Sequence, residues 1–206
     1  MPVFFQHQIN DHTRLGIWKI EESEEFFKAH VPVHREVTHP RKRLQHLAGR
    51  FLLPFLFPDF PHRLIRIADT KKPFLAGEQY HFSISHCGDY AAAIVSRDKR
   101  VGIDIEIPAE KIEMIRWKFL KEQEWALFQL AESMDPDYRL LTLLWSCKEA
   151  VFKWYGGGEV DFRKHIQLQA IDPDNQRISC FFAKNNTPLT LDYHLFDQLV
   201  LSWVVS

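Results

Sequence analysis

The chain is poor in cysteine, and this scarcity excludes a disulfide scaffold. Its three cysteines, Cys87, Cys147 and Cys180, are odd in number and far apart in a chain of 206 residues. Small secreted domains held together by disulfides are much denser in cysteine. We therefore expect a protein of a reducing compartment, which makes the cytoplasm the expected location.

Long apolar runs and an excess of one charge are missing as well. No uncharged stretch approaches the roughly 20 residues of a membrane-spanning helix, and Met1–Asn10 lacks the basic-then-apolar pattern of a secretory signal. The formal net charge is −1, which argues against a general nucleic-acid binder. We expect no membrane and no nucleic-acid partner. The length suits one domain or two small halves packed together.

The apolar pattern predicts helices and then strands, twice along the chain. After an extended start, helical spacing predicts helices over 21–30, 40–57, 110–117, 122–133 and 136–155. Alternation predicts strands over 81–86, 90–96, 101–107, 166–171, 177–182, 189–196 and 199–205. We expect the first three of these strands to be adjacent and antiparallel, and Pro54 to bend or end its helix. The fold class is α+β, with halves 1–100 and 101–206.

The segment 101–107 alternates apolar and polar residues without a break. Gly102, Asp104 and Glu106 therefore share one face of the predicted strand. Two carboxylates this close repel each other. A hard divalent cation would relieve the repulsion, and Mg²⁺ typically takes one or two carboxylates together with substrate phosphates. The alternative is the solvated polar face of an edge strand.

A second polar face lies on the predicted helix 136–155. Trp145, Glu149 and Lys153 are spaced by four residues and so lie on one side of it. Taken alone, this pattern is also typical of an exposed Glu–Lys pair. Beside a strand with two acids, a third carboxylate would complete a cation site and the lysine would hold the phosphate that shares the cation.

A third polar group stands at the end of the predicted strand 81–86. Ser85 and His86 precede the turn Cys87-Gly88-Asp89. Both side chains can donate to a phosphate oxygen, and a protonated histidine would add charge. A hydrogen-bonded turn with a structural histidine is the alternative.

Together the three segments resemble the 4′-phosphopantetheinyl transferases, and specifically their surfactin-synthetase-activator (Sfp) type. The motifs read FSISHCGDYAAA, VGIDIEI and WSCKEAVFKWYGGG, and they follow one another in the family's order. The resemblance covers roughly residues 40–160. It implies a monomer built as a pseudo-dimer of two similar α+β halves, each an antiparallel sheet packed by helices. The first half would face the adenine and 3′-phosphate of coenzyme A, and the second would carry the metal and the catalytic residues.

The resemblance also implies a reaction and a catalytic set. The phosphopantetheine arm of coenzyme A would pass to a serine of an apo acyl or peptidyl carrier protein, leaving 3′,5′-ADP. Asp104, Glu106 and Glu149 would bind Mg²⁺ or Mn²⁺. Lys153 would contact the pyrophosphate, and Glu149 is the candidate general base.

The residues expected to hold coenzyme A come from the first half. Ser85 and His86 would approach the phosphates, and Lys72-Pro73 matches the family's Gly-Lys-Pro step, with Lys71 in place of the glycine. Arg43 or Arg50 would contact a phosphate, and the register leaves the choice open.

Two more residues of the second half lie within motifs. Glu124 resembles a recurring acid of the family, and Lys148 would point about a quarter-turn away from Glu149.

Two other readings and one surface remain to be tested. The chain could be a Mg²⁺-dependent pyrophosphohydrolase of coenzyme A or nucleotides, or a non-catalytic domain that binds coenzyme A or a carrier. The basic segment Pro40-Arg41-Lys42-Arg43 is a candidate docking surface for an acidic carrier, with binding of the 3′-phosphate as the competing explanation. Whether the carrier serves fatty-acid, polyketide or nonribosomal-peptide synthesis is left open.

Overall fold

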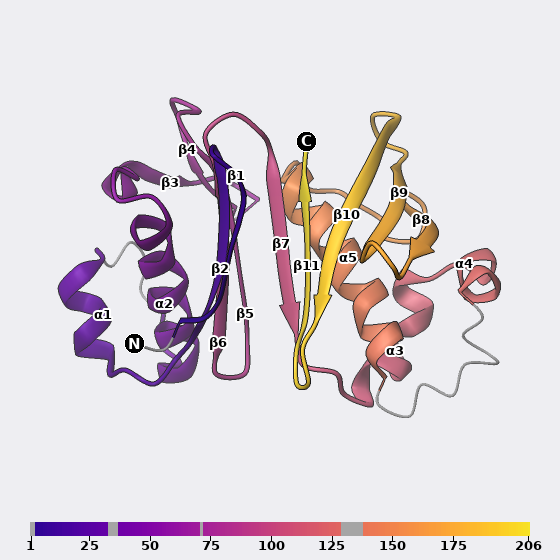
Figure 1. Cartoon of the computed structure of the whole chain (residues 1–206), viewed down its shortest axis with the longest axis horizontal. Coiled ribbons are helices and arrows are strands. Elements are labelled where there is room, and N and C mark those ends of the chain that lie inside the picture. The colour runs from indigo at the N-terminus through magenta and orange to yellow at the C-terminus, as the bar shows by residue number, and fades with distance from the viewer. Residues whose placement is uncertain (1–2, 33–36, 71, 129–137) are drawn as a thin grey trace. The chain divides into compact units, whose positions relative to one another are not determined.

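The computed structural model describes residues 3–32, 37–70, 72–128 and 138–206 (Figure 1). Lys71 lies outside these residues. The chain divides into two compact units, Met1–Val101 and Gly102–Ser206. Each unit contains a sheet of antiparallel pairs and helices packed on it, which confirms the predicted α+β class. No helix of the described ranges is both long and apolar enough to cross a membrane.

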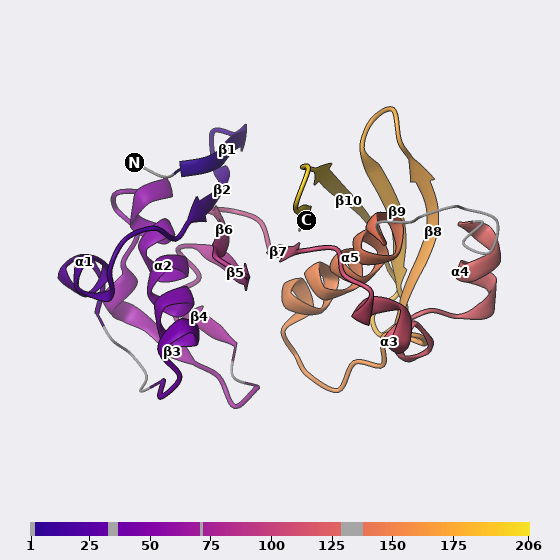
Figure 2. The same ribbon diagram turned by 90° about the horizontal axis from the view of Figure 1, so that it is seen from below.

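The first unit is a four-stranded sheet covered by helices. The sheet has the order β1-β2-β6-β5, and every neighbouring pair is antiparallel. Its strands are β1 (Val3–Asn10), β2 (Thr13–Lys19), β5 (His81–Cys87) and β6 (Tyr90–Ser96). The helices α1 (Glu24–His30) and α2 (Pro40–Leu56) lie on the same side of this sheet (Figure 2). A 3₁₀ turn, His62–Leu64, leads to the small pair β3 (Ile65–Ile67) and β4 (Pro73–Leu75).

Helix α2 places its apolar face on the sheet and continues through a proline. Pro40 stands in its first turn, and the His39 side chain accepts a hydrogen bond from the Lys42 amide. Pro54 removes one intrahelical hydrogen bond, but the helix runs on to Leu56. Of the two predicted effects of Pro54, a bend or an end of the helix, the second is therefore wrong. The buried side chains of Leu52 and Leu56 keep the last turn against the core.

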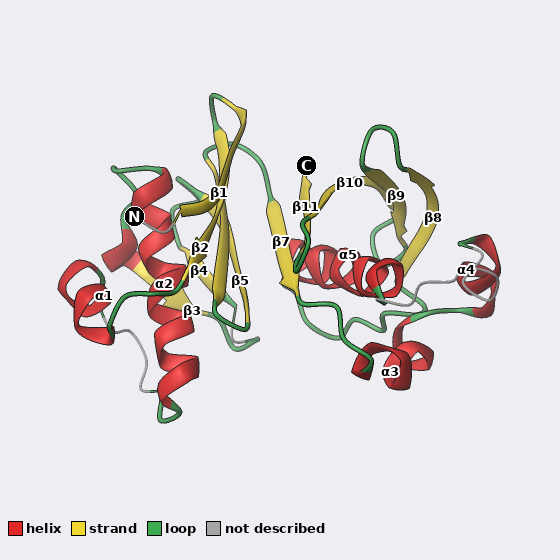
Figure 3. Cartoon of the chain, turned by 60° about the horizontal axis from the view of Figure 1, so that its bottom comes forward, coloured by secondary structure: helices red, strands yellow, loops and turns green. Residues whose placement is uncertain are grey.

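The second unit is a five-stranded sheet that curves around a long helix (Figure 3). The order is β7-β11-β10-β9-β8, from β7 (Val101–Glu106), β8 (Ile166–Asp172), β9 (Arg177–Phe182), β10 (Thr187–Leu195) and β11 (Val200–Val205). The helices are α3 (Lys111–Phe119), α4 (Glu122–Leu127) and α5 (Arg139–Tyr155). Helix α5 ends at Gly156, whose left-handed φ of 68° favours glycine.

One predicted strand pairing is wrong. Strands β5 and β6 pair as expected, but β7 joins the second sheet beside β11 and does not continue the first. Adjacency in sequence favoured a three-stranded meander. Gly102 lies so close to α5 that an added Cβ would meet the backbone of Ala150 and Trp154, and this close contact holds β7 in the second unit.

Candidate functional site

Gly102 allows the carboxylate strand to approach helix α5. A Cβ atom at this position would lie 2.0 Å from the Ala150 carbonyl oxygen and 2.7 Å from the Trp154 amide nitrogen. Both are backbone atoms and cannot turn away. The glycine therefore brings the polar face of β7 directly against α5, with Asp104 and Glu106 two and four residues further along the same face.

Lys153 of α5 bonds to Asp104 of β7. The Lys153 ammonium donates to Asp104 Oδ1 over 2.6 Å, and the Asp104 side chain is almost fully buried. Strand β7 does lie at the edge of its sheet, but its polar face is not solvated at Asp104, so this part of the alternative is wrong. The exposed Glu149–Lys153 pair is also wrong, because the lysine reaches across to the strand.

Glu149 lies in the same buried, negatively charged environment. Burial, and after it the charge of Asp104, raises the pKa of Glu149 to about 7. The ammonium of Lys153 opposes this shift, and Glu106 adds to it. All three carboxylates predicted to bind metal are thus electrostatically coupled in one place.

Trp145 holds the carboxylate of Glu106. Its indole Nε1 donates to Glu106 Oε1 over 3.2 Å. The Trp145 ring packs edge-on against Phe119, with centroids 5.1 Å apart, and at 5.5 Å from Phe162. Trp145 was predicted to share the face of Glu149 and Lys153. Its hydrogen bond to Glu106 is an addition that helical spacing could not reveal.

The carboxylates fit a divalent cation by chemistry, but the described residues do not form a closed metal cage. No group of three or more His, Cys, Asp or Glu side chains in the described ranges is gathered to hold a metal ion. Asp104 is bonded to Lys153 and Glu106 to Trp145. Mutual repulsion among Asp104, Glu106 and Glu149 is the reason why a hard oxygen-binding cation suits them.

In the first unit, Ser85 and His86 stand near the end of β5 beside helix α2. Ser85 is buried and His86 is half-buried. The His86 ring lies 5.3 Å from the ring of His46 on α2. The helix approaches β5 closely at Gly49, where a Cβ atom would lie 2.5 Å from Ile84. The structure therefore brings α2 and the Ser-His step together.

The two arginines between which the sequence could not decide have different surroundings. Arg43 Nε donates to Glu24 over 2.8 Å, and its Nη1 donates to the Val37 and Thr38 carbonyls. Arg50, two turns further along α2, has a buried Nη1 with no hydrogen-bond partner among the described residues. Burial lowers the pKa of its guanidinium. A buried donor without a partner is costly, and an anionic ligand would satisfy it.

Lys72 lies at the other end of β5 from the Ser-His step. Burial lowers the pKa of Lys72 to about 8, and Arg100 contributes to the shift. The charge of Lys72 also lowers the pKa of His81, whose main shift comes from burial. His81 and His86 are the first and sixth residues of β5, so about 16 Å of strand separates them. Lys72 and His86 are therefore suited to different parts of an extended ligand. Pro73 opens β4.

Glu124 and Lys148, both within motifs, form an ion pair. Lys148 of α5 is buried against Glu124 of α4. Lys148 thus points away from the polar face of α5, as its position next to Glu149 predicts. Its pairing with Glu124 was not foreseen, because the two lie in different helices.

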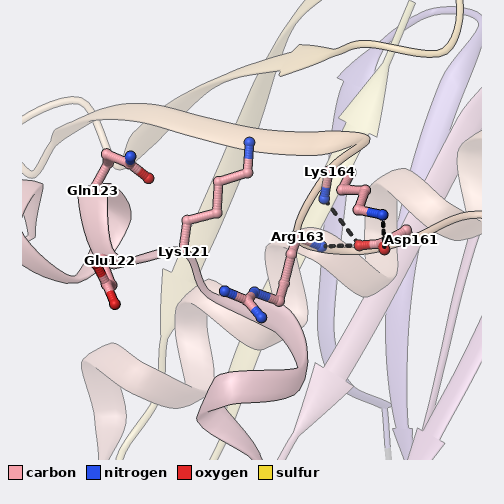
Figure 4. Close-up of a pocket in the computed structure, with 6 residues that line it drawn as sticks. All are labelled: Lys121, Glu122, Gln123, Asp161, Arg163 and Lys164. Carbon is pink, nitrogen blue, oxygen red and sulfur yellow. Dashed lines mark hydrogen bonds and ion pairs between the residues drawn. The ribbon is translucent and has the colours of Figure 1, made fainter.

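A pocket of about 500 Å³ opens on the second unit (Figure 4). Its lining residues are Lys121, Glu122, Gln123, Asp161, Arg163 and Lys164. The backbone amides of Arg163 and Lys164 each donate a hydrogen bond of 2.9 Å to Asp161 Oδ1. Among the described residues no carboxylate lies within ion-pairing distance of Lys121 or Arg163. Three of the six lining residues are cationic. The sequence did not predict this surface.

Comparison with known proteins agrees with this chemistry. The family model of the 4′-phosphopantetheinyl transferase superfamily matches residues 100–204. The chain is 31% identical over 160 residues to the 4′-phosphopantetheinyl transferase AcpT of Escherichia coli strain K12, covering 73% of this chain and 79% of that protein. It is 30% identical over 128 residues to enterobactin synthase component D of the same strain, covering 60% of each. A Xenopus laevis protein, L-aminoadipate-semialdehyde dehydrogenase-phosphopantetheinyl transferase, is 29% identical over 133 residues, covering 54% of this chain and 43% of that protein.

Proposed function

The chain belongs to the 4′-phosphopantetheinyl transferase superfamily, and from this premise we propose how its residues carry out the reaction. As an enzyme of this family it transfers the phosphopantetheine arm of coenzyme A to a carrier protein. The finer assignment to the surfactin-synthetase-activator type, acting as a monomer, rests on the three motifs. The observation that carries the site is the buried Asp104–Lys153 bond beside Glu149.

We assign the divalent cation to Asp104, Glu106 and Glu149. When bound, Mg²⁺ would neutralise charge on the pyrophosphate of coenzyme A. Mn²⁺ suits the same oxygen donors. In the present arrangement Lys153 supplies the positive charge next to Asp104. Lys153 is therefore placed to change partners, from Asp104 to a pyrophosphate oxygen.

The chemical step joins a serine of the carrier to phosphopantetheine. The serine oxygen forms a bond to the β-phosphorus, the bond from that phosphorus to the bridging pyrophosphate oxygen breaks, and 3′,5′-ADP leaves with the electron pair. The serine proton passes to the Glu149 carboxylate, directly or through water. Positioning and charge neutralisation provide most of the catalysis in such displacements. Lys153 and Glu149, one helical turn apart on α5, supply the charge neutralisation and the proton acceptor.

The first unit supplies the contacts to the nucleotide part of coenzyme A. We choose Arg50 over Arg43, because Arg43 is already engaged with Glu24 while a buried Arg50 nitrogen lacks a partner among the described residues. Ser85 and His86 bind one phosphate at the end of β5. Lys72, with Pro73 beside it, binds a different part of the nucleotide.

The carrier is expected to dock through charge. Arg41 and Lys42 are exposed at the start of α2, and Arg41 pairs with Asp89 at 2.9 Å. An exposed pair of this kind contributes little stability, so an acidic partner can exchange with Asp89 at low cost. We therefore keep this surface as the docking site for the carrier.

Intact-mass spectrometry of an apo carrier protein incubated with the enzyme, coenzyme A and Mg²⁺ tests the whole proposal. We expect a mass gain equal to one phosphopantetheine, lost with EDTA and with Asp104→Ala. Fatty-acid, polyketide and peptide carriers assayed in parallel identify the pathway. Cleavage of coenzyme A without carrier modification would instead indicate a hydrolase. Intact coenzyme A with every carrier unmodified would indicate a binding domain.

A further inference from the structure

A buried ion pair lies outside the proposed catalytic set. The Lys148 ammonium is 2.6 Å from Oε1 and 2.9 Å from Oε2 of Glu124. The side chain of Lys148 is 0% exposed and that of Glu124 is 5% exposed. Burying two charges is costly, and a pair of apolar residues of the same size is often at least as stable. The stability of the fold therefore does not by itself account for this pair.

The pair binds backbone groups from four segments. Lys148 Nζ donates to the carbonyl oxygens of Phe119 at 2.7 Å, Ile166 at 2.8 Å and Phe162 at 3.1 Å. Glu124 accepts from the amides of Lys121 at 2.8 Å and Leu168 at 2.9 Å. The end of α3, the start of α4, the segment before β8 and β8 itself are thus all tied to α5 at one point.

The same segments confine Trp145. Lys148 holds the carbonyl groups of Phe119 and Phe162, and the rings of these two residues pack on Trp145. Trp145 in turn donates to Glu106. Glu149 follows Lys148 directly on α5. A continuous series of contacts therefore runs from the ion pair to two of the proposed metal ligands.

We propose that Glu124 and Lys148 are positioning residues for phosphopantetheine transfer. They fix the aromatic residues around Trp145 and the rotation of α5, and so hold Glu106 and Glu149 in place without touching substrate. This inference rests on the proposed function, because it assumes that Glu106 and Glu149 act in the reaction. A small misplacement of catalytic groups is enough to cost about 10²-fold in rate.

The test compares Glu124→Gln, Lys148→Met and the double variant with wild type. Each is assayed for kcat, for KM toward coenzyme A and toward carrier, and for Tm. Either single change leaves a buried charge unpaired and lowers Tm. The double change removes both charges, so Tm recovers part of the loss, although the carbonyl groups that Lys148 bound lose their donor. We expect kcat to stay about 10- to 100-fold low in the double variant, with KM for coenzyme A within about threefold of wild type. Asp192→Asn, which breaks the exposed Arg177–Asp192 pair, is the control and leaves kcat unchanged.

Recovery of kcat together with Tm in the double variant would show a purely structural role and overturn the inference. A rise in KM for coenzyme A that accounts for the whole loss would overturn it as well. If the single variants do not fold, Glu124→Asp keeps the charge and shortens the side chain. This milder change should lower kcat with both KM values unchanged, and an unchanged kcat refutes the inference.

Glu149→Gln separates this inference from the proposed function. If Glu149→Gln keeps full turnover, the assignment of Glu149 in the proposed function is wrong. The Glu124–Lys148 double variant still reports on positioning, because its kcat and Tm are compared with each other.

Discussion

Lys153 and Asp104 are 49 positions apart in sequence and joined by a 2.6 Å hydrogen bond in the structure. The Lys153 ammonium is thus bonded to one of the carboxylates proposed to bind a divalent cation. In the proposed function, a divalent cation held by Asp104 would compete with the Lys153 ammonium for this carboxylate. The ammonium would then be available to contact the pyrophosphate.

Removal of Lys153 should separate metal binding from catalysis. In Lys153→Met we expect Mg²⁺, titrated calorimetrically without coenzyme A, to bind more tightly than in wild type, because the competing charge is gone. We expect kcat to fall by about 10²-fold, the effect of losing one charged group that stabilises the transition state. Asp104→Asn should weaken Mg²⁺ binding. Unchanged or weaker Mg²⁺ binding in Lys153→Met would contradict the competition.

Gly102 should not tolerate even one added methyl group. A Cβ there would lie 2.0 Å from the Ala150 carbonyl oxygen, so Gly102→Ala must push β7 away from α5. We expect a loss of about 2 kcal/mol or more in the free energy of unfolding, measured by urea denaturation, together with loss of transfer. Gly77→Ala is the matched control, because its Cβ would meet nothing closer than 3.7 Å. Equal stability of the two variants would disprove the close approach.

Substitution of Arg50 should change KM for coenzyme A, whereas substitution of Arg43 should change Tm. Arg50→Met removes the buried nitrogen proposed to meet a phosphate, so KM for coenzyme A should rise by about 10-fold or more, as hydrogen bonds to charged groups contribute about 1.5–3 kcal/mol. Arg43→Met breaks the pair with Glu24, so it should lower Tm slightly and leave KM nearly unchanged. The opposite pattern in steady-state kinetics and thermal melts would reverse the assignment.

Lys72 should make nucleotide binding sensitive to alkaline pH. Its pKa is lowered to about 8. The ammonium is therefore present at pH 7 and is lost as the pH rises through the pKa. Binding of 3′,5′-ADP, measured by calorimetry, should therefore weaken from pH 7 to pH 9.5. Lys72→Met should bind weakly at both values. Between about pH 8 and 10.5 the unfolded chain keeps the Lys72 proton and the folded chain has lost it. The free energy of unfolding therefore rises with pH through that window.

The carrier should distinguish two cation-rich surfaces. Charge reversal with Arg41→Glu and Lys42→Glu should raise KM for the carrier more than KM for coenzyme A, and the effect should shrink at high salt. The matched variant, Lys121→Glu with Arg163→Glu, changes the pocket of the second unit by the same charge (Figure 4). If only the second variant impairs the carrier, docking belongs to that pocket and the proposed surface is wrong.

Local pattern was enough to predict much of the secondary structure. Alternation located both ends of β8 to β11 within two residues, and helical spacing located α2 and α5. The pairing of β7 was wrong because alternation states which faces a strand has, not which strand lies beside it. The four-stranded and five-stranded sheets follow from burial across distant segments.

The sequence by itself determined the family, the α+β class and the residue types for cation and phosphate chemistry, because these depend on motifs and short periodicities. The tertiary structure decided which groups meet. It joined Lys153 to Asp104 rather than to Glu149, and it buried Lys148 against Glu124. It paired Arg43 with Glu24, whereas a buried nitrogen of Arg50 has no partner among the described residues. Each of these partners lies at least 19 positions away in sequence. Only folding determines which of several possible opposite charges is close enough to bind.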